Sequence, residues 1–440
     1  MKPPELLAPA GTLNKLRYAI AYGADAVYAG MPRYSLRVRE NDFSCIEQLA
    51  RGIQSAHEKG KRFYLACNAI PHNRKLNTFL GDIAPVIDLA PDALIMADPG
   101  LIMLVREKWP DLPIHLSVQA NTVNHAGVRF WQALGLKRII LSRELSLEEI
   151  AEIRQECPDI ELEVFVHGAL CIAYSGRCLL SGYFNHRDAN QGTCTNSCRW
   201  QYGVTKAEVD DNGNVEPAGL TGSQTGNGKR HTNSSDTYLL EERERPGEML
   251  PIEEDENGTY IMNSKDLRAI EHIGRLVSMG IDSLKIEGRT KSHYYVSRVS
   301  QVYRKAIQDA VDGREFDKRQ WSVLDNLANR GYTDGFFQRH GSDVYQNYVD
   351  NRSNNYRQRF VAELRDYDGD TGLVEIETKN KFAIGDRLEI IRPEGNHSFI
   401  LEHMQDEQGN LVKEVPGGGH RVYMPVEEGD YAMGLLARFV

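Results

Sequence analysis

Short apolar runs alternate with amphipathic stretches of helical length along the chain up to about residue 170. The runs recur every ~20–30 residues, which is the spacing of βα units that build a parallel sheet. They predict seven strands, at Glu5–Ala8, Ala26–Ala29, Phe63–Cys67, Ala93–Ala97, Ile114–Val118, Arg138–Leu141 and Leu162–Val166. Helices are expected between them at Leu13–Tyr22, Ile46–Lys59, Ala126–Leu134 and Leu147–Gln155.

An eighth strand is predicted at Ser283–Ile286, followed by a helix at His293–Val311. A long insertion precedes this strand, and its polar stretch at Thr221–Thr237 has the composition of a mobile segment. Order is expected to return near Tyr260–Asn263, with a helix at Lys265–Met279. Eight βα units favour an α/β fold of the (β/α)8 TIM-barrel type. A doubly wound open sheet is the alternative, since strand order cannot be read from the sequence.

The pattern changes beyond Gly313. A linker over residues 314–359, with a helix at Arg319–Asn329, leads to alternating runs such as Leu373–Glu377 and Arg387–Ile391. Gly and Asp turns separate these runs, which is typical of a small all-β barrel. The 440 residues are therefore divided into a barrel domain over 1–313, with an insertion over 168–258, the linker, and a C-terminal β domain over 360–440.

The formal net charge of −10 is unlike that of a dedicated non-specific nucleic-acid binder, which is usually basic. An RNA site would then need a local basic patch. The first residues read MKPPE with no apolar region behind them, and no apolar run reaches ~18 residues. We expect a cytoplasmic protein with no membrane partner.

Polar residues follow nearly every predicted barrel strand, at the end where barrel enzymes carry their chemistry. The candidate acid–base groups among them are His167, Glu144, Asp98 and Glu287. The candidate substrate contacts are Tyr28, Asn68, Gln119, Asn121, Arg143 and Arg289. His167 has an unperturbed pKa near ~6.5 and suits proton transfer, but it could equally contact substrate or be a hydrogen-bonded strand-end residue. The alternative for the whole set is that polar residues simply begin loops.

The loop after the second predicted strand holds three arginines and a tyrosine: Arg33, Tyr34, Arg37 and Arg39. Arginines grip phosphates and tyrosine stacks on bases, so the loop is a candidate RNA contact. An exposed loop whose arginines pair with Glu40 and Asp42 is the alternative.

Four of the seven cysteines gather in one segment, at Cys171, Cys178, Cys194 and Cys198. In an intracellular protein such clustering indicates a metal or redox site rather than a disulfide framework. Four thiolates can hold a [4Fe–4S] cluster or a zinc ion. The spacing between Cys171 and Cys178 is wider than zinc ribbons use, which modestly favours iron. Redox disulfides and unligated thiols remain open.

The segment from Glu163 to Ser181, which reads ELEVFVHGALCIAYSGRCLLS with its two preceding residues, resembles the signature of peptidase family U32. Similar stretches occur at Leu7–Gly11, Ala24–Gly30, Asn263–Leu267 and Leu284–Arg289. The resemblance extends through the C-terminal β domain. It leaves out the polar insertion over residues 207–245.

The resemblance implies a [4Fe–4S] cluster held by Cys171, Cys178, Cys194 and Cys198. It also implies prephenate-dependent hydroxylation of wobble uridine to 5-hydroxyuridine in tRNA. The expected partners are thus the tRNA anticodon region, a small acidic cosubstrate derived from prephenate, and an electron donor. Two alternatives stay open: a collagenase-like peptidase with a site at His167 and Cys171, and an RNA-binding module with a structural metal site.

Overall fold

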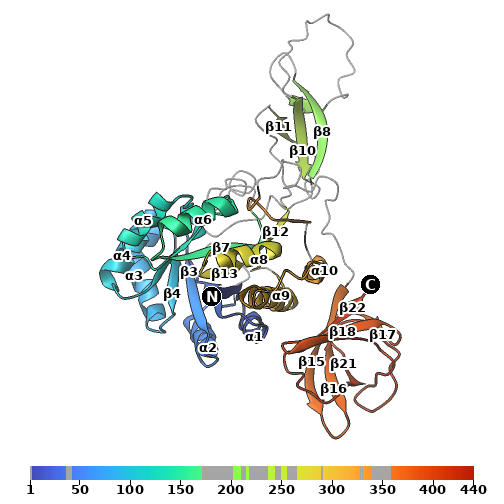
Figure 1. The fold of residues 1–440 in the computed structure, drawn as a ribbon. Helices are drawn as coiled ribbons and strands as arrows, with labels where there is room; N and C mark the ends of the chain where they lie inside the picture. Colours follow the sequence, from blue (N-terminus) through green and yellow to red (C-terminus); the bar gives the residue numbers. More distant parts are fainter. Residues whose placement is uncertain are drawn as a thin grey trace, which may run out of the picture.

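The computed structural model describes residues 2–35, 42–170, 202–209, 215–217, 236–242, 249–254, 265–288, 291–327, 329, 331–338 and 358–440. Eight parallel strands form a closed barrel (Figure 1). It closes because β13 pairs with β7 on one side and with β1, the first strand, on the other. The barrel strands are β1 (Glu5–Pro9), β2 (Ala26–Gly30), β3 (Arg62–Cys67), β4 (Ala93–Met96), β5 (Ile114–Leu116), β6 (Arg138–Ile140), β7 (Glu161–Ala169) and β13 (Ser283–Ile286). The predicted (β/α)8 barrel is confirmed, and the open sheet is excluded.

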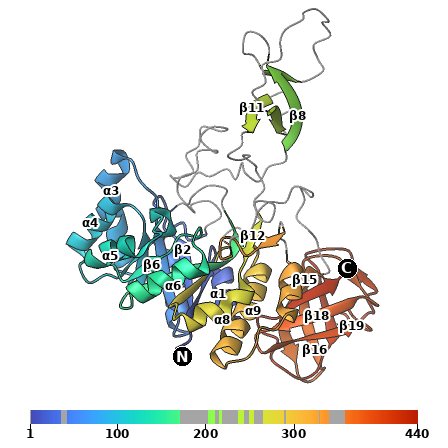
Figure 2. The same ribbon diagram turned by 45° about the horizontal axis from the view of Figure 1, so that its top comes forward.

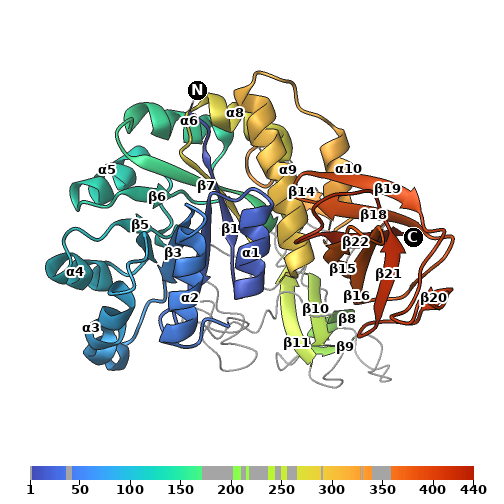
Figure 3. The same cartoon turned by 90° about the horizontal axis from the view of Figure 1, so that it is seen from below.

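Helices surround this barrel (Figure 3). They are α1 (Leu13–Ala21), α2 (Ile46–His57), α3 (Asn73–Ile87), α4 (Pro99–Lys108), α5 (His125–Ala133), α6 (Leu147–Glu156), α8 (Ile273–Ser278) and α9 (His293–Val311). Several begin at a side chain that accepts a hydrogen bond from the first helical turn, as Thr12, Asn124 and Ser292 do for α1, α5 and α9. These caps satisfy backbone N–H groups that the helix itself leaves unpaired.

The helix predicted at Lys265–Met279 is wrong in its first half. Residues Asp266–Arg268 form strand β12, which runs antiparallel to the last residues of β7, and the helix α8 starts only at Ile273. β12 also pairs with the short strand β14 (Tyr332–Thr333). The pairing that decides this segment joins residues about a hundred positions apart, so local periodicity does not reveal it.

The end of the barrel at which the strands begin is filled by buried ionic groups. Arg138, 2% exposed, lies 2.6 Å from Glu5 and 3.1 Å from Glu163. The Lys285 ammonium lies 2.8 Å from the other oxygen of Glu163, and the Tyr64 hydroxyl donates to Glu5. Each buried charge thus has opposite charges beside it, as burial requires. We call Glu5, Tyr64, Arg138, Glu163 and Lys285 the barrel floor.

The C-terminal domain is an antiparallel all-β unit. Its main sheet has the order β19-β18-β22-β15-β16-β21, and β17 pairs with β20. The bounds are β15 (Gln358–Asp368), β16 (Leu373–Thr378), β17 (Phe382–Ala383), β18 (Arg387–Arg392), β19 (Gly395–Ile400), β20 (Glu414–Val415), β21 (Arg421–Pro425) and β22 (Leu435–Phe439). The predicted all-β character is confirmed. Within residues 358–440, no strand pairing joins β19 to β21 to close the sheet into a barrel.

This domain lies beside α9 (Figure 2) and also contacts Tyr22, the residue that follows α1. The Tyr22 hydroxyl donates to the carbonyl oxygens of Ile391 and Met433, at 2.8 and 2.9 Å. Arg298 of α9, 1% exposed, lies 3.2 Å from Glu389. Ile391, with Leu435 and Ala437, belongs to the same buried apolar cluster as the barrel. Of the predicted linker helix, the structure has α10 at Arg319–Asp325.

The insertion carries a further antiparallel sheet, with the order β11-β10-β8-β9, that stands away from the barrel in Figure 1. Its strands are β8 (Tyr202–Val209), β9 (Val215–Pro217), β10 (Asp236–Glu242) and β11 (Met249–Glu254). The sequence did not predict this sheet. Residues 218–235, most of the stretch expected to be mobile, and the expected return of order at Tyr260–Asn263 lie outside the described residues. Among the helices that the structure describes, none has the length and apolarity needed to span a membrane.

Candidate active site at the barrel mouth

Two amide side chains that the sequence singled out meet where β3 and β5 end. The Asn68 side-chain amide donates to Oε1 of Gln119 at 3.1 Å, and both residues are less than a tenth exposed. The Ser117 hydroxyl also bonds Oε1 of Gln119. Asn121 takes the left-handed conformation, at φ 51°, and its side chain donates to the Gln119 carbonyl oxygen at 3.0 Å. Amides held by such contacts offer fixed donors and acceptors to a planar polar ligand. Ser117 was missed in the sequence.

Arg143 joins three strand ends across the mouth. Its guanidinium lies 3.7 Å from the Glu287 carboxylate and 3.9 Å from the centroid of the Phe165 ring. It also donates to the carbonyl oxygen of Ala169 at 3.1 Å. Both ion-pair side chains are about a tenth exposed, at 10% and 12%. Nε of Arg143 is buried without a partner among the described residues. A ligand carboxylate could therefore reach the guanidinium only through the tenth of the side chain that is exposed.

Glu144 and Tyr28 are also held in place. The Glu144 carboxylate accepts a hydrogen bond from Ser142. The Tyr28 hydroxyl donates to the Ile286 carbonyl oxygen at 3.0 Å, and the Lys285 ammonium lies 4.5 Å from the centre of the Tyr28 ring. Lys285 thereby connects the floor to the mouth. The sequence signal for it was a lysine between the two apolar residues Leu284 and Ile286 of a predicted strand.

Gly168 fixes the approach of β7 to the residue after β13. Its φ is +103°, and a Cβ atom there would lie 2.1 Å from the Glu287 carbonyl oxygen. The Glu287 N–H donates to the His167 carbonyl oxygen at 2.8 Å. Only glycine permits this conformation and this contact, and the result is a defined position for Glu287.

His167 lies away from the mouth, among the rings of Tyr295, Tyr303 and Tyr332. It is 0% exposed, and Nδ1 lies 3.2 Å from the Tyr303 hydroxyl. Burial, together with the cations Lys291 and Arg268, lowers its pKa to about 3. The imidazole is therefore neutral at physiological pH and closed to solvent. Of the interpretations offered for His167, this geometry favours a histidine that is hydrogen-bonded at the end of a strand. The acid–base role stays a prediction that the geometry does not support.

Asp98 and Tyr34 are used within the fold. Asp98 caps α4 by accepting a hydrogen bond from the Leu101 N–H at 2.8 Å. Tyr34 is 0% exposed, packs edge-on against Phe79, and donates to Asp82 at 2.6 Å. The prediction that Tyr34 stacks on a base is therefore wrong, because its ring is not accessible. Arg33 pairs with the same Asp82 at 2.7 Å.

Three predicted RNA contacts, Arg37, Arg39 and Arg289, lie outside the described residues, as do Cys171, Cys178, Cys194 and Cys198. The cysteine segment begins directly after Leu170, beside the carbonyl of Ala169 that Arg143 contacts. Elsewhere in the described ranges, no group of three or more His, Cys, Asp or Glu side chains could hold a metal. Cys45, Cys67 and Cys157 are free thiols, and burial raises the pKa of Cys67.

Comparison with known proteins gives concordant matches. The model of peptidase family U32 matches residues 11–347, and that of the peptidase family U32 C-terminal domain matches residues 356–438. The "tRNA hydroxylation protein P" of Escherichia coli K12 is 57% identical over 97% of this chain and 95% of its own length. The protein of the same name from Haemophilus influenzae is 54% identical over 97% of this chain and 94% of its own.

Among solved structures, the U32 peptidase Mk0906 is 16% identical, over 45% of this chain and 82% of its own, with a TM-score of 0.36. The two family models together span nearly the whole chain, from the first barrel helix to the last strand of the C-terminal domain. The chain belongs to peptidase family U32.

Proposed function

We propose that this protein hydroxylates tRNA, converting wobble uridine to 5-hydroxyuridine in a prephenate-dependent reaction at the barrel mouth. The observation that carries the proposal is the 57% identity, over almost the whole chain, to a protein named for tRNA hydroxylation. The mouth supports it, because it combines neutral amides with a partly open arginine. An anticodon base is unpaired and can leave its stack to enter such a pocket.

The amide cluster suits the uracil ring. Uracil presents one N–H donor between two carbonyl acceptors, and the side chains of Asn68, Gln119 and Asn121 offer both kinds of group. Because Asn68 and Gln119 are bonded to each other, their orientation is set before the base arrives. Binding then costs little ordering of these side chains.

Arg143 suits a small acidic cosubstrate. Its guanidinium lies within the ring of strand ends, is only partly neutralised by Glu287 at 3.7 Å, and retains an unpartnered Nε among the described residues. A carboxylate bound there would lie near the carbonyl oxygen of Ala169, two residues before Cys171. Glu287, 3.7 Å from Arg143, and Glu144, the next residue along the chain after Arg143, are the candidates for proton transfer.

The donor set of Cys171, Cys178, Cys194 and Cys198 fits a [4Fe–4S] cluster in number and in ligand chemistry. Arg143 contacts the carbonyl oxygen of Ala169, two residues before Cys171, and on that ground the group is proposed to lie close to the mouth. A bound cluster would supply one-electron chemistry there. Converting the C5–H bond of uridine to C5–OH removes two electrons from the base, so a separate redox partner is proposed to exchange electrons with the cluster.

The family's name makes a peptidase the second candidate. In the part of the chain that the structure describes, no cysteine sulfur hydrogen-bonds a histidine ring: Cys67 contacts Met31, and Cys157 contacts a backbone carbonyl. Cys171, the nucleophile expected for such a site, lies outside the described residues. His167, the expected base, is 0% exposed, and its pKa is lowered to about 3. A weak base that is closed to solvent activates a thiol poorly, so the burial of His167 counts against the peptidase.

The test is made on protein purified without oxygen and incubated with prephenate and with tRNA from a strain that lacks the gene. Because hydroxylation removes two electrons from the base, a chemical redox mediator is supplied in its oxidised form in one reaction and in its reduced form in another. Nucleoside analysis should detect 5-hydroxyuridine, and omission of prephenate should abolish it. A gelatin or collagen-peptide digest run in parallel should show no cleavage. Cleavage without any modified nucleoside would replace the hydroxylase with the peptidase.

A further inference from the structure

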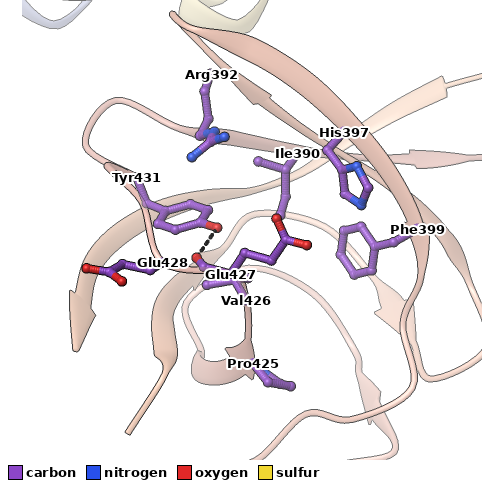
Figure 4. A pocket seen from close by; sticks show the side chains of 9 residues that line it. All are labelled: Ile390, Arg392, His397, Phe399, Pro425, Val426, Glu427, Glu428 and Tyr431. Carbon is purple, nitrogen blue, oxygen red and sulfur yellow. Dashed lines mark hydrogen bonds between the residues drawn. The ribbon is translucent and has the colours of Figure 1, made fainter. Parts of the chain in front are cut away.

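A second cavity lies in the C-terminal domain, on the side of the sheet formed by β18 and β19. Its volume is about 380 Å³, which falls in the range of small-molecule sites. Its floor is Ile390, and its walls come from β18, β19 and the segment between β21 and β22 (Figure 4). All of these residues lie far from the barrel mouth in the sequence, and the proposed reaction does not use them.

Aromatic rings form the two sides of this cavity. His397 and Phe399 are stacked, with 6.2 Å between centroids and 8° between planes. Tyr431 stands on the other side, 5% exposed, and its hydroxyl donates to the Glu427 carbonyl oxygen at 2.7 Å. The Arg392 guanidinium lies 4.9 Å from the Tyr431 ring centre. Such rings are the surfaces on which unpaired bases stack in RNA-binding proteins.

Charge decides which part of a nucleic acid fits. Glu427 and Glu428 line the cavity together with one cation, Arg392, so the charged groups of its lining sum to −1 and do not favour a phosphate. Figure 4 shows the Glu427 carboxylate directed toward Ile390 and Phe399, whereas that of Glu428 points away from them. A carboxylate accepts hydrogen bonds through two oxygens. Guanine is the base that offers two adjacent N–H donors on its Watson–Crick edge, whereas adenine and uracil alternate donors with acceptors.

We propose that this cavity binds one unstacked guanine of the RNA, with its edge on Glu427 and its face against Phe399. The proposal rests on the proposed function, because it assumes an RNA substrate. The C-terminal domain then supplies a second contact at a fixed distance from the mouth. That distance is maintained by α9, whose Gln301 donates to the Arg392 carbonyl oxygen at 2.8 Å.

The test uses the full chain and three labelled pentanucleotides of uridine with guanosine, inosine or adenosine at the centre, followed by fluorescence anisotropy. Inosine lacks the exocyclic amino group of guanosine and so removes one donor. Guanosine should bind about tenfold more tightly than adenosine, a difference of about 1.4 kcal/mol, with inosine between them. Equal affinity for guanosine and adenosine would overturn the proposal.

Variants locate the site. Glu427→Gln and Phe399→Leu should abolish the preference for guanosine, and Glu428→Gln, with the same charge change one residue away, should retain it. His397→Ala, at an exposed position, gives a second stacking variant if Phe399→Leu lowers the melting temperature. A preference that survives Glu427→Gln refutes the assignment. Formation of 5-hydroxyuridine is measured separately. If guanosine binds specifically but no 5-hydroxyuridine forms, the proposed hydroxylase activity is refuted and the guanine site is supported. If 5-hydroxyuridine forms but no base is preferred, the guanine site is refuted and the hydroxylase activity is supported.

Discussion

Replacing Arg138 by methionine tests whether the barrel floor is a set of mutually dependent charges. Arg138 is 2% exposed and contacts Glu5 at 2.6 Å, Glu163 at 3.1 Å and Glu161 at 2.8 Å. Methionine fills much of the same space without the charge. The change therefore removes the cation while leaving the two buried carboxylates in place.

The loss of folding free energy depends on which cations remain beside Glu5 and Glu163. Glu163 retains Lys285 at 2.8 Å, and Glu5 retains the half-exposed Arg62 at 3.2 Å. Removing one partner of a buried ion pair typically costs about 3–5 kcal/mol. Because each carboxylate keeps one cation, we expect the lower end, about 3 kcal/mol at pH 7. That is a large share of the roughly 5–15 kcal/mol that stabilises a domain.

The cost should depend on pH with a defined sign. Burial raises the pKa of Glu163, but Lys285 and Arg138 outweigh burial, so the net pKa lies below its usual value of 4.5. A lowered pKa contributes stability that is present above the unfolded value and is lost as the pH falls through the folded value. Without Arg138 the folded pKa rises, so the variant takes up its proton earlier. The difference between wild type and variant should narrow below about pH 4.5.

Urea denaturation followed by far-ultraviolet circular dichroism measures both effects, at pH 7 and at pH 4. Arg129→Met is the matched control, since Arg129 pairs with Glu156 at 2.6 Å on the surface, with about half of each side chain exposed. It should cost no more than about 1 kcal/mol. If the Arg138 variant is as stable as this control at pH 7, or if its deficit grows on acidification, the floor is not held by these ion pairs.

Three further changes test Gly168 and Arg143 at the mouth and Cys194 of the predicted cluster. Gly168→Ala should lower the melting temperature by several degrees and impair hydroxylation, because its Cβ would meet the Glu287 carbonyl oxygen; thermal unfolding and nucleoside analysis check this. Cys194→Ser should lower the iron and sulfide content of protein purified without oxygen, while Cys45→Ser should not; unchanged iron in the first would remove Cys194 from the ligands. Arg143→Lys keeps the charge but loses the planar fork, so the KM for prephenate should rise about tenfold or more with little loss of stability, and an unchanged KM would place the carboxylate elsewhere.

The barrel could be predicted because its information is local. All eight strands occur within a few residues of their predicted bounds, since apolar runs of strand length mark each of them. The failures come from long-range contacts. Asp266–Arg268 became a strand because β7 extends beyond the barrel and offers it an edge. Tyr34 is buried because its hydroxyl donates a hydrogen bond to Asp82, which lies 48 positions further along the chain.

The site was predicted in part for the same reason. The ends of parallel barrel strands converge, so the sequence alone places Asn68 and Gln119 in one group. The structure shows them in contact. Which way a side chain points at such an end depends on register and bulges. The register shift between Lys285 and Ile286 opposite β7 lies beside His167, whose ring faces the tyrosines of α9. A register shift of this kind cannot be predicted from the alternation of side chains along a strand.

Helix α9 connects the two proposed binding places. At its first turns the Tyr295 hydroxyl donates to the Glu287 carbonyl oxygen at 3.3 Å, on the mouth side. Arg298 and Gln301 then contact β18 of the C-terminal domain, at Glu389 and at the Arg392 carbonyl oxygen. A helix of 19 residues is about 28 Å long and rigid on the scale of an RNA loop. Because one helix fixes both Glu287 and the wall of the guanine pocket, an RNA that engages the pocket presents its remaining nucleotides to the mouth at a set distance, and selection of the substrate can precede its chemistry.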